Sequence, residues 1–309
     1  MNNDWQNIID NCQLFWQYPV RTEKEFYFQN RFEENYIGFP WATVLDKHVN
    51  FPGVIQYLKP FIENDVKYYT CCQHIRFREL ESIFKELNIK KLYTPHKCMG
   101  EDQIGSTILQ PCPLYAVNIE DHTRNNVFHN KNLMEVKRKY LYSFMGGLQP
   151  GYLTDIRDRI FNLLLTENTY IENTGGWHFN ELVYTSYQNR NETLNISLRH
   201  KYKTQKYNEV LLNSRFSLCP SGTGPNSIRF WESLAVGAIP VLLSDTLELP
   251  PNDKWDSAVV RLDESNLNDL PDILSNISEA EESERRQNCL SLYKIYRNNY
   301  SYNPEKIHV

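Results

Sequence analysis

The chain has 309 residues, which suits two domains of about 150 residues each better than one core. Hydrophobic residues make up 41% and charged residues 23%, as in globular proteins, and a net charge of −5 argues against a basic surface for nucleic acid. No apolar run has the length of a transmembrane helix, and the N-terminus lacks the features of a signal peptide. We therefore expect a cytoplasmic protein, at most peripherally associated with the inner face of the cell membrane.

Cysteine usage indicates reduced thiols. The chain has seven cysteines and no Cys-x-x-C motif. Cys71 and Cys72 are adjacent, which is a poor geometry for a disulfide between them. Because no paired Cys/His spacing typical of zinc is present, we expect neither a metal ion nor a cofactor.

In the first half of the chain, apolar runs alternate with a helical pattern. The apolar residues of 77–87 recur at helical spacing, which predicts a helix there. Extended segments are predicted at residues 35–45, 67–74, 91–95 and 114–119.

The second half continues the alternation. Strands are predicted at residues 140–144, 215–219 and 238–243, and helices at residues 152–165, 227–236 and 278–299. Strands that alternate with helices are typical of parallel sheets. We therefore predict an α/β fold of two Rossmann-like, doubly wound domains, residues 1–135 and 136–309, with ligands bound beyond the carboxyl ends of the strands.

Residues 215–250 have the pattern of a phosphate site. A buried strand ends at Pro220, and a turn of small residues then leads into a helix that begins near Pro225 or Asn226. Such a turn presents free backbone N–H groups and the positive end of the helix dipole to an anion. The residues expected to contact a phosphate are Ser221, Gly222, Thr223, Asn226 and Ser227.

Two charged residues follow on the predicted helix. The guanidinium of Arg229 can bind a diphosphate in a bidentate manner, and the carboxylate of Glu232 can accept hydrogen bonds from ribose hydroxyls. In an ordinary strand–turn–helix, the same two residues would form an i,i+3 ion pair. The glycine turn alone does not separate these two interpretations.

The whole segment resembles the C-terminal signature of the exostosin family. The signature is a Phe-x-Leu-Cys-Pro strand, a glycine turn, Ser-x-Arg, a helix with Glu, then Gly-x-Ile-Pro-Val, Asp and Leu-Pro. The matching residues are Phe216, Leu218, Cys219, Pro220, Gly222, Ser227, Arg229, Glu232, Gly237, Ile239, Pro240, Val241, Asp245, Leu249 and Pro250. Upstream, residues 142–147 and 156–157 are similar to the first strand and helix of the same domain.

This resemblance implies a GT-B glycosyltransferase, with two Rossmann-like domains facing a cleft and a C-terminal helix that crosses back. It implies inverting transfer from a nucleotide sugar, usually UDP-linked, to an oligosaccharide or lipid-linked glycan. By position, Ser227, Arg229 and Glu232 would hold the diphosphate and ribose, and Gly146 and Arg157 would face the cleft. The chain lacks the membrane anchor and disulfides usual in animal and plant members, which favours a bacterial or viral member that acts in surface polysaccharide synthesis.

The sequence also favours a metal-independent reaction. No Asp-x-Asp, the usual metal-binding motif of the GT-A fold, occurs in the chain. Arginine, lysine and a helix dipole would then neutralise the leaving diphosphate.

Inverting transfer needs a base that takes the proton of the acceptor hydroxyl, and in a GT-B enzyme this base belongs to the N-terminal domain. Asp46 ends an apolar run, and His74 ends a predicted strand; we rank Asp46 first and His74 second. Asp121 and His122 follow another predicted strand. Trp41 can stack on an acceptor sugar.

Two other functions remain as alternatives. A fucosyltransferase-like enzyme that uses GDP-fucose would have a comparable Glu-bearing helix before a Pro-Val-Val strand, although the Cys-Pro-x-Gly turn and Ser-x-Arg favour the exostosin pattern. A catalytically inactive subunit that binds a sugar nucleotide and pairs with an active partner would keep the donor site without a working base.

Overall fold

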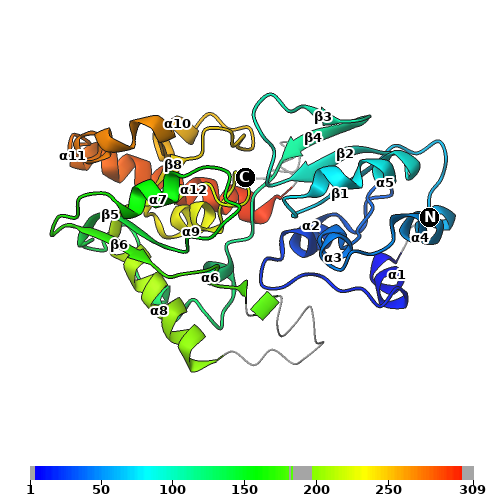
Figure 1. The fold of residues 1–309 in the computed structure, drawn as a ribbon, viewed down its shortest axis with the longest axis horizontal. Helices are drawn as coiled ribbons and strands as arrows, with labels where there is room; N and C mark the ends of the chain where they lie inside the picture. The colour runs from blue at the N-terminus through cyan, green and yellow to red at the C-terminus, as the bar shows by residue number, and fades with distance from the viewer. Residues whose placement is uncertain (1–3, 181, 184–196, 301–309) are drawn as a thin grey trace. The chain divides into compact units, whose positions relative to one another are not determined.

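The computed structural model of the chain describes residues 4–180, 182–183 and 197–300 (Figure 1). The chain forms two compact units. The first comprises residues 1–114, 247–250 and 299–309, and the second comprises residues 115–246 and 251–298. Each has a sheet with parallel strands and helices around it, which confirms the predicted α/β class. No helix in the described ranges combines the length and apolarity needed to cross a membrane.

The first unit is built on a four-stranded sheet in the order β1-β2-β4-β3. β1 (Tyr68–Cys71), β2 (Ile89–Thr94) and β4 (Thr107–Pro111) are parallel, and β3 (Gln103–Ile104) pairs antiparallel with β4. The strands predicted at residues 67–74 and 91–95 are confirmed. The β3–β4 hairpin is hidden in the sequence because β4 exposes the apolar Ile108, which breaks the alternation of apolar and polar residues.

The helices of the first unit are short. They are α1 (Trp5–Asn11), α2 (Thr22–Asn30), α3 (Trp41–Asp46), α4 (Phe51–Leu58), η1 (Lys59–Phe61), η2 (Phe77–Leu80) and α5 (Glu81–Glu86). The helix predicted at residues 77–87 is confirmed as η2 followed by α5.

The extended segment predicted at residues 35–45 is wrong over its second half. Tyr36 forms an isolated bridge with Tyr69, but α3 then begins after Pro40. The carboxylate of Glu23 accepts a hydrogen bond from the Ala42 N–H at the start of α3 (3.0 Å). Every residue of α3 before Asp46 is buried, and a short, fully buried helix cannot be told from a buried strand by its apolar pattern.

The second unit contains a five-stranded parallel sheet in the order β6-β5-β7-β8-β9. Its strands are β5 (Tyr140–Gly146), β6 (Thr169–Asn173), β7 (Ser214–Pro220), β8 (Ile239–Leu243) and β9 (Val260–Arg261). The three strands predicted here are confirmed. All five residues of β8 are buried, as expected for a strand covered on both faces.

Helices surround this sheet. They are α6 (Val117–Glu120), η3 (Asn126–Phe128), α7 (Ile156–Phe161), α8 (Leu198–Leu212), α9 (Ile228–Val236), α10 (Trp255–Ala258), η5 (Glu264–Asp269), α11 (Leu270–Ser275) and α12 (Glu279–Asn298). The strand predicted at residues 114–119 is wrong, because α6 begins within it. α7 is shorter than the helix predicted at residues 152–165.

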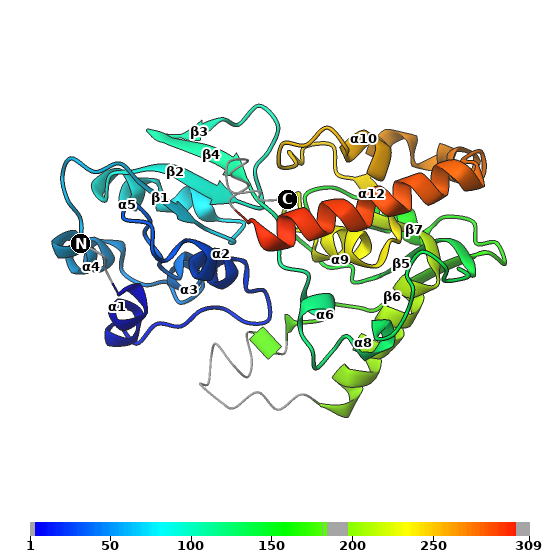
Figure 2. The ribbon, with the colours of Figure 1, turned by 180° about the vertical axis from the view of Figure 1, so that it is seen from behind.

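α9 is held between the sheet and α12 (Figure 2). It ends at Gly237, whose φ of 65° is left-handed and whose added Cβ would lie 2.8 Å from the Arg286 side chain. α12 packs its Tyr296 ring parallel to Trp255, with ring centroids 5.5 Å apart, and edge-on to Trp231. The segment that follows β7 is thereby fixed from both sides.

The predicted domain division at residue 135 differs from the division into units. Residues from Tyr115 onward belong to the second unit, where the backbone N–H of Asn118 donates to Glu232 of α9 (2.8 Å). After α12, the chain belongs to the first unit, where the Tyr300 N–H donates to Gln29 (2.8 Å). The division of the chain into functional domains at residue 135 stays a prediction.

Candidate active site

In the second unit, the carboxyl ends of β5 and β7 carry most of the predicted donor-binding residues. The two strands are neighbours in the sheet, with Ser143 opposite Ser217. β5 ends at Gly146 and β7 at Pro220, so Ser221 and Gly222 follow at the same edge. This is the edge at which doubly wound sheets bind their ligands.

Arg157, on α7, lies across this edge. Its Nε donates to the carbonyl of Ser221 (2.8 Å) and its Nη1 to the carbonyl of Gly147 (3.1 Å). The guanidinium lies 4.5 Å from the centre of the Tyr152 ring. Burial, and then the positive charge of Arg229, lowers the pKa of Arg157 to about 10. A lowered pKa in an arginine indicates a positive charge that the protein itself compensates poorly.

Arg229, on α9, approaches the same place from the other side. It donates to the carbonyl of Met145, and its guanidinium lies 4.8 Å from the centre of the Phe144 ring and 5.0 Å from that of Tyr207. Arg157 also lies against the Phe144 ring, at 5.7 Å. Among the described residues, no carboxylate forms a salt bridge with either arginine. Two cations whose described partners are carbonyls, ring faces and the Tyr152 hydroxyl, none of them charged, form a site for an anion.

Two glycines leave room for these side chains. A Cβ on Gly146 would lie 2.8 Å from the Phe144 ring and 3.2 Å from the Arg229 guanidinium. A Cβ on Gly222 would lie 3.0 Å from the Arg157 guanidinium. Both positions were selected from the sequence, and here their missing side chains admit the arginines.

The turn before α9 differs from the prediction in its cap. Ser227, not Asn226, is the N-cap residue, and its side chain makes no capping bond. Asn226 is buried, and its Oδ1 accepts from the Ser227 N–H (2.8 Å) and the Trp231 indole (3.2 Å), so it holds the turn together. Thr223 is exposed at the tip of the turn.

The sequence predicts that Glu232 binds a ribose, but its carboxylate already has hydrogen-bond donors within the unit. Its side chain is 1% exposed. One oxygen accepts from the backbone N–H of Asn118 (2.8 Å) and the other from the hydroxyl of Tyr207 (2.7 Å). Burial raises the pKa of Glu232, and these two donors oppose the shift. The carboxylate ties α6 and α8 to α9, and we do not assign it to a ribose.

Three residues at this edge escape sequence reasoning. Tyr207 lies on α8, a helix that the sequence does not predict, and Tyr152 precedes α7. Glu264 accepts from the Ser221 hydroxyl (3.3 Å), and its own backbone N–H donates to Asp245 (3.0 Å). Burial, and then contact with Asp245, raises the pKa of Glu264.

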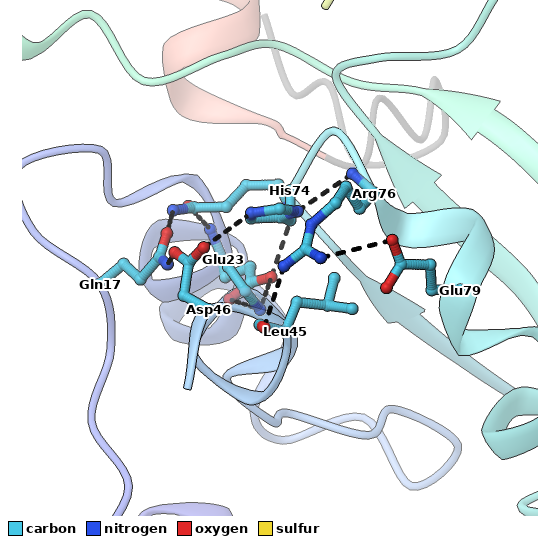
Figure 3. Close-up of polar contacts among 9 residues, drawn as sticks. Gln17, Glu23, Leu45, Asp46, His74, Arg76 and Glu79 are labelled. Carbon is cyan, nitrogen blue, oxygen red and sulfur yellow. Dashed lines mark hydrogen bonds and ion pairs between the residues drawn. The ribbon is translucent and has the colours of Figure 1, made fainter. Parts of the chain in front are cut away.

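In the first unit, the structure brings the two predicted base candidates together (Figure 3). Asp46 is the last residue of α3, and His74 follows β1. The Nε2 of His74 lies 3.0 Å from Oδ1 of Asp46, and the other oxygen of Asp46 accepts from the amide of Gln17. The Arg76 N–H donates to Nδ1 of His74 (3.0 Å). The side chains of Asp46 and His74 are 8% and 12% exposed.

Trp41 is not available to stack on a sugar. It is fully buried, and its indole N–H donates to the hydroxyl of Thr70 (2.7 Å). Its ring packs edge-on against Phe84, with centroids 5.5 Å apart. The assignment of Trp41 to acceptor binding is therefore wrong, because the helix that replaces the predicted strand turns this ring into the core.

Asp121 has a structural role in the described chain. It accepts from the N–H and hydroxyl of Thr123 (2.9 and 2.7 Å) and pairs with Arg124 (3.2 Å). His122 is exposed at this turn. Among the residues for which positions are described, no three His, Cys, Asp or Glu side chains are grouped as metal ligands.

A carboxylate beside the Asp46–His74 pair has an altered pKa. Glu23 accepts from the backbone N–H groups of Ala42 (3.0 Å) and Gln73 (3.1 Å) and is 2% exposed. Burial raises the pKa of Glu23 to about 8, although these donors oppose the shift. Glu23 therefore holds a proton at neutral pH more often than an exposed carboxylate.

The comparisons with known proteins bear on the second unit. The model described as Exostosin GT47 domain matches residues 106–277, which is more than half of the chain. The chain belongs to the exostosin GT47 family. This is a family of glycosyltransferases. The match includes Arg157, Arg229 and the whole sheet edge around them, whereas Asp46 and His74 lie outside it.

Exostosins are also found among curated relatives. The chain is 28% identical over 170 residues to the Exostosin-1 homolog of Caenorhabditis elegans, 31% over 176 residues to Exostosin-1c of Danio rerio, and 32% over 170 residues to Exostosin-1 of Drosophila melanogaster. These matches cover 54%, 54% and 53% of this chain, but only 43%, 22% and 21% of the relatives. The chain thus spans less than half the length of each of these exostosins.

Proposed function

We propose that this chain transfers a sugar from a nucleotide-sugar donor to a glycan acceptor. Membership of the exostosin GT47 family supports glycosyl transfer. The observation that carries the proposal is the pair of guanidinium groups of Arg157 and Arg229, which lie at one sheet edge without a carboxylate partner in the described chain. A leaving diphosphate has the charge and the oxygens that such a pair binds best.

We propose a GT-B organisation for this reaction, in which the second unit binds the donor and the first binds the acceptor. The transfer inverts the anomeric carbon, with its base supplied by the Asp46–His74 pair. Arg157, Arg229 and the N-terminus of α9 neutralise the leaving group, so the reaction needs no metal ion.

The family pattern favours a UDP-sugar as the donor. The acceptor we propose is an oligosaccharide or lipid-linked glycan of a surface polysaccharide. A GDP-fucose donor is the alternative, because the Glu-bearing helix followed by an apolar Pro-containing strand is common to both patterns. Location in the cytoplasm, at most peripheral to the membrane, stays a prediction from composition.

Thermal unfolding in the presence of UDP, GDP, CMP, TDP and ADP, each with and without EDTA, tests the donor site. A ligand at 100 times its Kd that binds only the folded chain adds about 2.7 kcal/mol of stability. We expect stabilisation by UDP that EDTA does not change. Stabilisation by GDP alone would favour the fucosyltransferase-like alternative, and stabilisation by none of the five would contradict the proposal.

Release of UDP from a panel of UDP-sugars, with and without glycoside acceptors, then tests transfer. We expect release that depends on an acceptor. Binding of UDP without release from any donor would instead indicate an inactive sugar-nucleotide-binding subunit.

A further inference from the structure

A series of hydrogen bonds in the first unit joins Gln73 to Gln17, Gln17 to Asp46 and Asp46 to His74. Figure 3 labels the last three of these residues. A side-chain amide or a neutral imidazole has one group that donates and one that accepts. A backbone N–H can only donate. A backbone N–H donates to the residue at each end of this series, so the direction of every hydrogen bond between them is fixed.

At the first end, the backbone N–H of Glu23 donates to Oε1 of Gln73 (3.0 Å). The amide nitrogen of Gln73 therefore points the other way and donates to Oε1 of Gln17 (3.0 Å). Gln17 in turn presents its own amide nitrogen to Oδ2 of Asp46. A backbone group thus fixes both glutamine amides.

At the other end, the backbone N–H of Arg76 donates to Nδ1 of His74 (3.0 Å). Nδ1 is then unprotonated, and the neutral ring carries its proton on Nε2, which donates to Oδ1 of Asp46 (3.0 Å). Arg76 is itself fixed by a bond from its guanidinium to the carbonyl of Leu45 (3.0 Å). Both nitrogens of His74 are therefore occupied.

This arrangement differs from a Ser-His-Asp triad. In the triad, the carboxylate binds one ring nitrogen and leaves the other free to take a proton. In this protein, Nδ1 of His74 accepts the hydrogen bond from the Arg76 backbone N–H, so neither ring nitrogen is free to take a proton from a substrate. Both oxygens of Asp46 accept hydrogen bonds, and each oxygen keeps a second lone pair for a further donor.

We infer, on the basis of the proposed transferase function, that Asp46 takes the proton of the acceptor hydroxyl and that His74 and Gln17 are positioning residues. In this step the acceptor oxygen forms its bond to the anomeric carbon. The bond from that carbon to the diphosphate oxygen breaks, and its electron pair stays with the diphosphate. The hydroxyl proton passes to the carboxylate of Asp46, which becomes a neutral acid.

The first test needs no substrate. Long-range ¹H–¹⁵N correlation spectra of the full chain at pH 8, assigned by the loss of signals in His74→Gln, report which ring nitrogen carries the proton. We expect the tautomer protonated on Nε2. A ring protonated on Nδ1, alone or together with Nε2, would overturn the inference whether or not the chain is a transferase.

The second test measures acceptor-dependent release of UDP from UDP-glucose, UDP-galactose, UDP-N-acetylglucosamine and UDP-glucuronic acid. Asp46→Asn should lower kcat by about 10²- to 10⁴-fold, the usual contribution of a general base. Stabilisation by UDP should be unchanged in this variant. Should Asp46→Asn not fold, because its NH₂ would face one of the two donors, Asp46→Ser replaces it. The exposed Asp65→Asn is the matched control.

A conservative variant separates a positioning role of His74 from a catalytic role. His74→Gln keeps an N–H that can reach Asp46, whereas His74→Ala does not. We expect His74→Gln to retain more activity than His74→Ala, with the difference in kcat rather than in KM. Full activity in Asp46→Asn, or equal kcat in His74→Gln and His74→Ala, would refute the inference, whereas failure of the wild-type chain to bind UDP would refute the proposed function instead.

Discussion

The two units compensate their charges in opposite ways. In the second unit, Arg157 and Arg229 donate to backbone carbonyls and lie against aromatic rings, with no salt bridge to a described carboxylate. In the first unit, Glu23 and Asp46 each accept at least two hydrogen bonds from groups of the same unit. The two arginines thus lack an internal counter-charge, whereas the two carboxylates already have hydrogen-bond donors within their own unit.

This difference indicates what each region is suited to bind. Half-buried cations without a counter-charge are destabilising until an anion arrives, so they favour a charged ligand. The carboxylate of Asp46, which has a donor from its own unit at each oxygen, is held in one orientation. The first arrangement suits a leaving diphosphate, and the second suits a base that must meet one hydroxyl.

Removal of an arginine at the second unit's sheet edge should have the largest effect on donor binding. A hydrogen bond to a charged group contributes about 1.5–3 kcal/mol, so Arg157→Gln and Arg229→Gln should each weaken UDP binding by about 10- to 100-fold. Transfer should fall further, by about 10²- to 10³-fold in kcat/KM, because charge on the diphosphate develops during the reaction. Calorimetric titration with UDP and steady-state kinetics measure the two effects.

The control for this experiment is Arg159→Gln, on the same helix as Arg157. It should leave UDP binding unchanged. Equal losses in all three variants would mean that general charge, rather than the geometry at Gly146 and Gly222, attracts the nucleotide.

Glu232 sharpens the comparison, because it belongs to the second unit but, like Asp46, accepts an internal hydrogen bond at each carboxylate oxygen. Glu232→Ala leaves the Asn118 N–H and the Tyr207 hydroxyl without their acceptor, and should destabilise the chain by about 2–4 kcal/mol. Tyr207→Phe removes one donor and should cost about 1–2 kcal/mol. Urea unfolding measures both. A Glu232→Ala chain of normal stability with weakened UDP binding would restore the ribose role.

The pH dependence of stability tests the buried carboxylate of Glu23 in the first unit. Burial raises the pKa of Glu23 to about 8 in the folded chain, above the ordinary value of 4.5 for this side chain. The folded state therefore binds the proton more tightly, so the stabilisation is complete below pH 4.5 and is lost as the pH rises through 8. Between these values stability should fall with a slope that approaches about 1.4 kcal/mol per pH unit.

Glu23→Gln should abolish this slope, because the amide does not titrate. Urea unfolding at pH 5, 6, 7 and 8 measures it, with the exposed Glu34→Gln as the control. A slope that persists in Glu23→Gln would assign the pH dependence to another group.

The fold around the arginine pair could be predicted because its signals are local. β7, α9 and β8 follow from an apolar run, a helical pattern and Gly237 at the helix end. α8 could not, because its inward face is polar. His200, Thr204 and Asn208 recur at helical spacing and are buried against Arg124, so hydrophobic periodicity does not reveal this helix.

The candidate site in the first unit was predictable only in part. Asp46 and His74 are chemically suited to act as bases, and sequence reasoning selects both. Their pairing depends on α3, which the sequence presents as a strand, and the state of His74 depends on a backbone N–H of Arg76. Such a contact leaves no trace in residue type, so the division of roles between the two residues requires the structure.

The smallest expected effect concerns the two hydroxyls of the turn after β7. Ser221 is buried, and its hydroxyl lies 3.3 Å from both Glu264 and Thr154, whereas Thr223 is exposed. Ser221→Ala should therefore destabilise the chain by about 1 kcal/mol, and Thr223→Ala should leave its stability unchanged. If Thr223 contacts the diphosphate, its alanine variant should weaken UDP binding by a few-fold only, since a neutral hydrogen bond contributes about 0.5–1.5 kcal/mol. Unchanged UDP binding in Thr223→Ala, together with a large loss in Arg229→Gln, would place the diphosphate at the arginines and away from the tip of the turn.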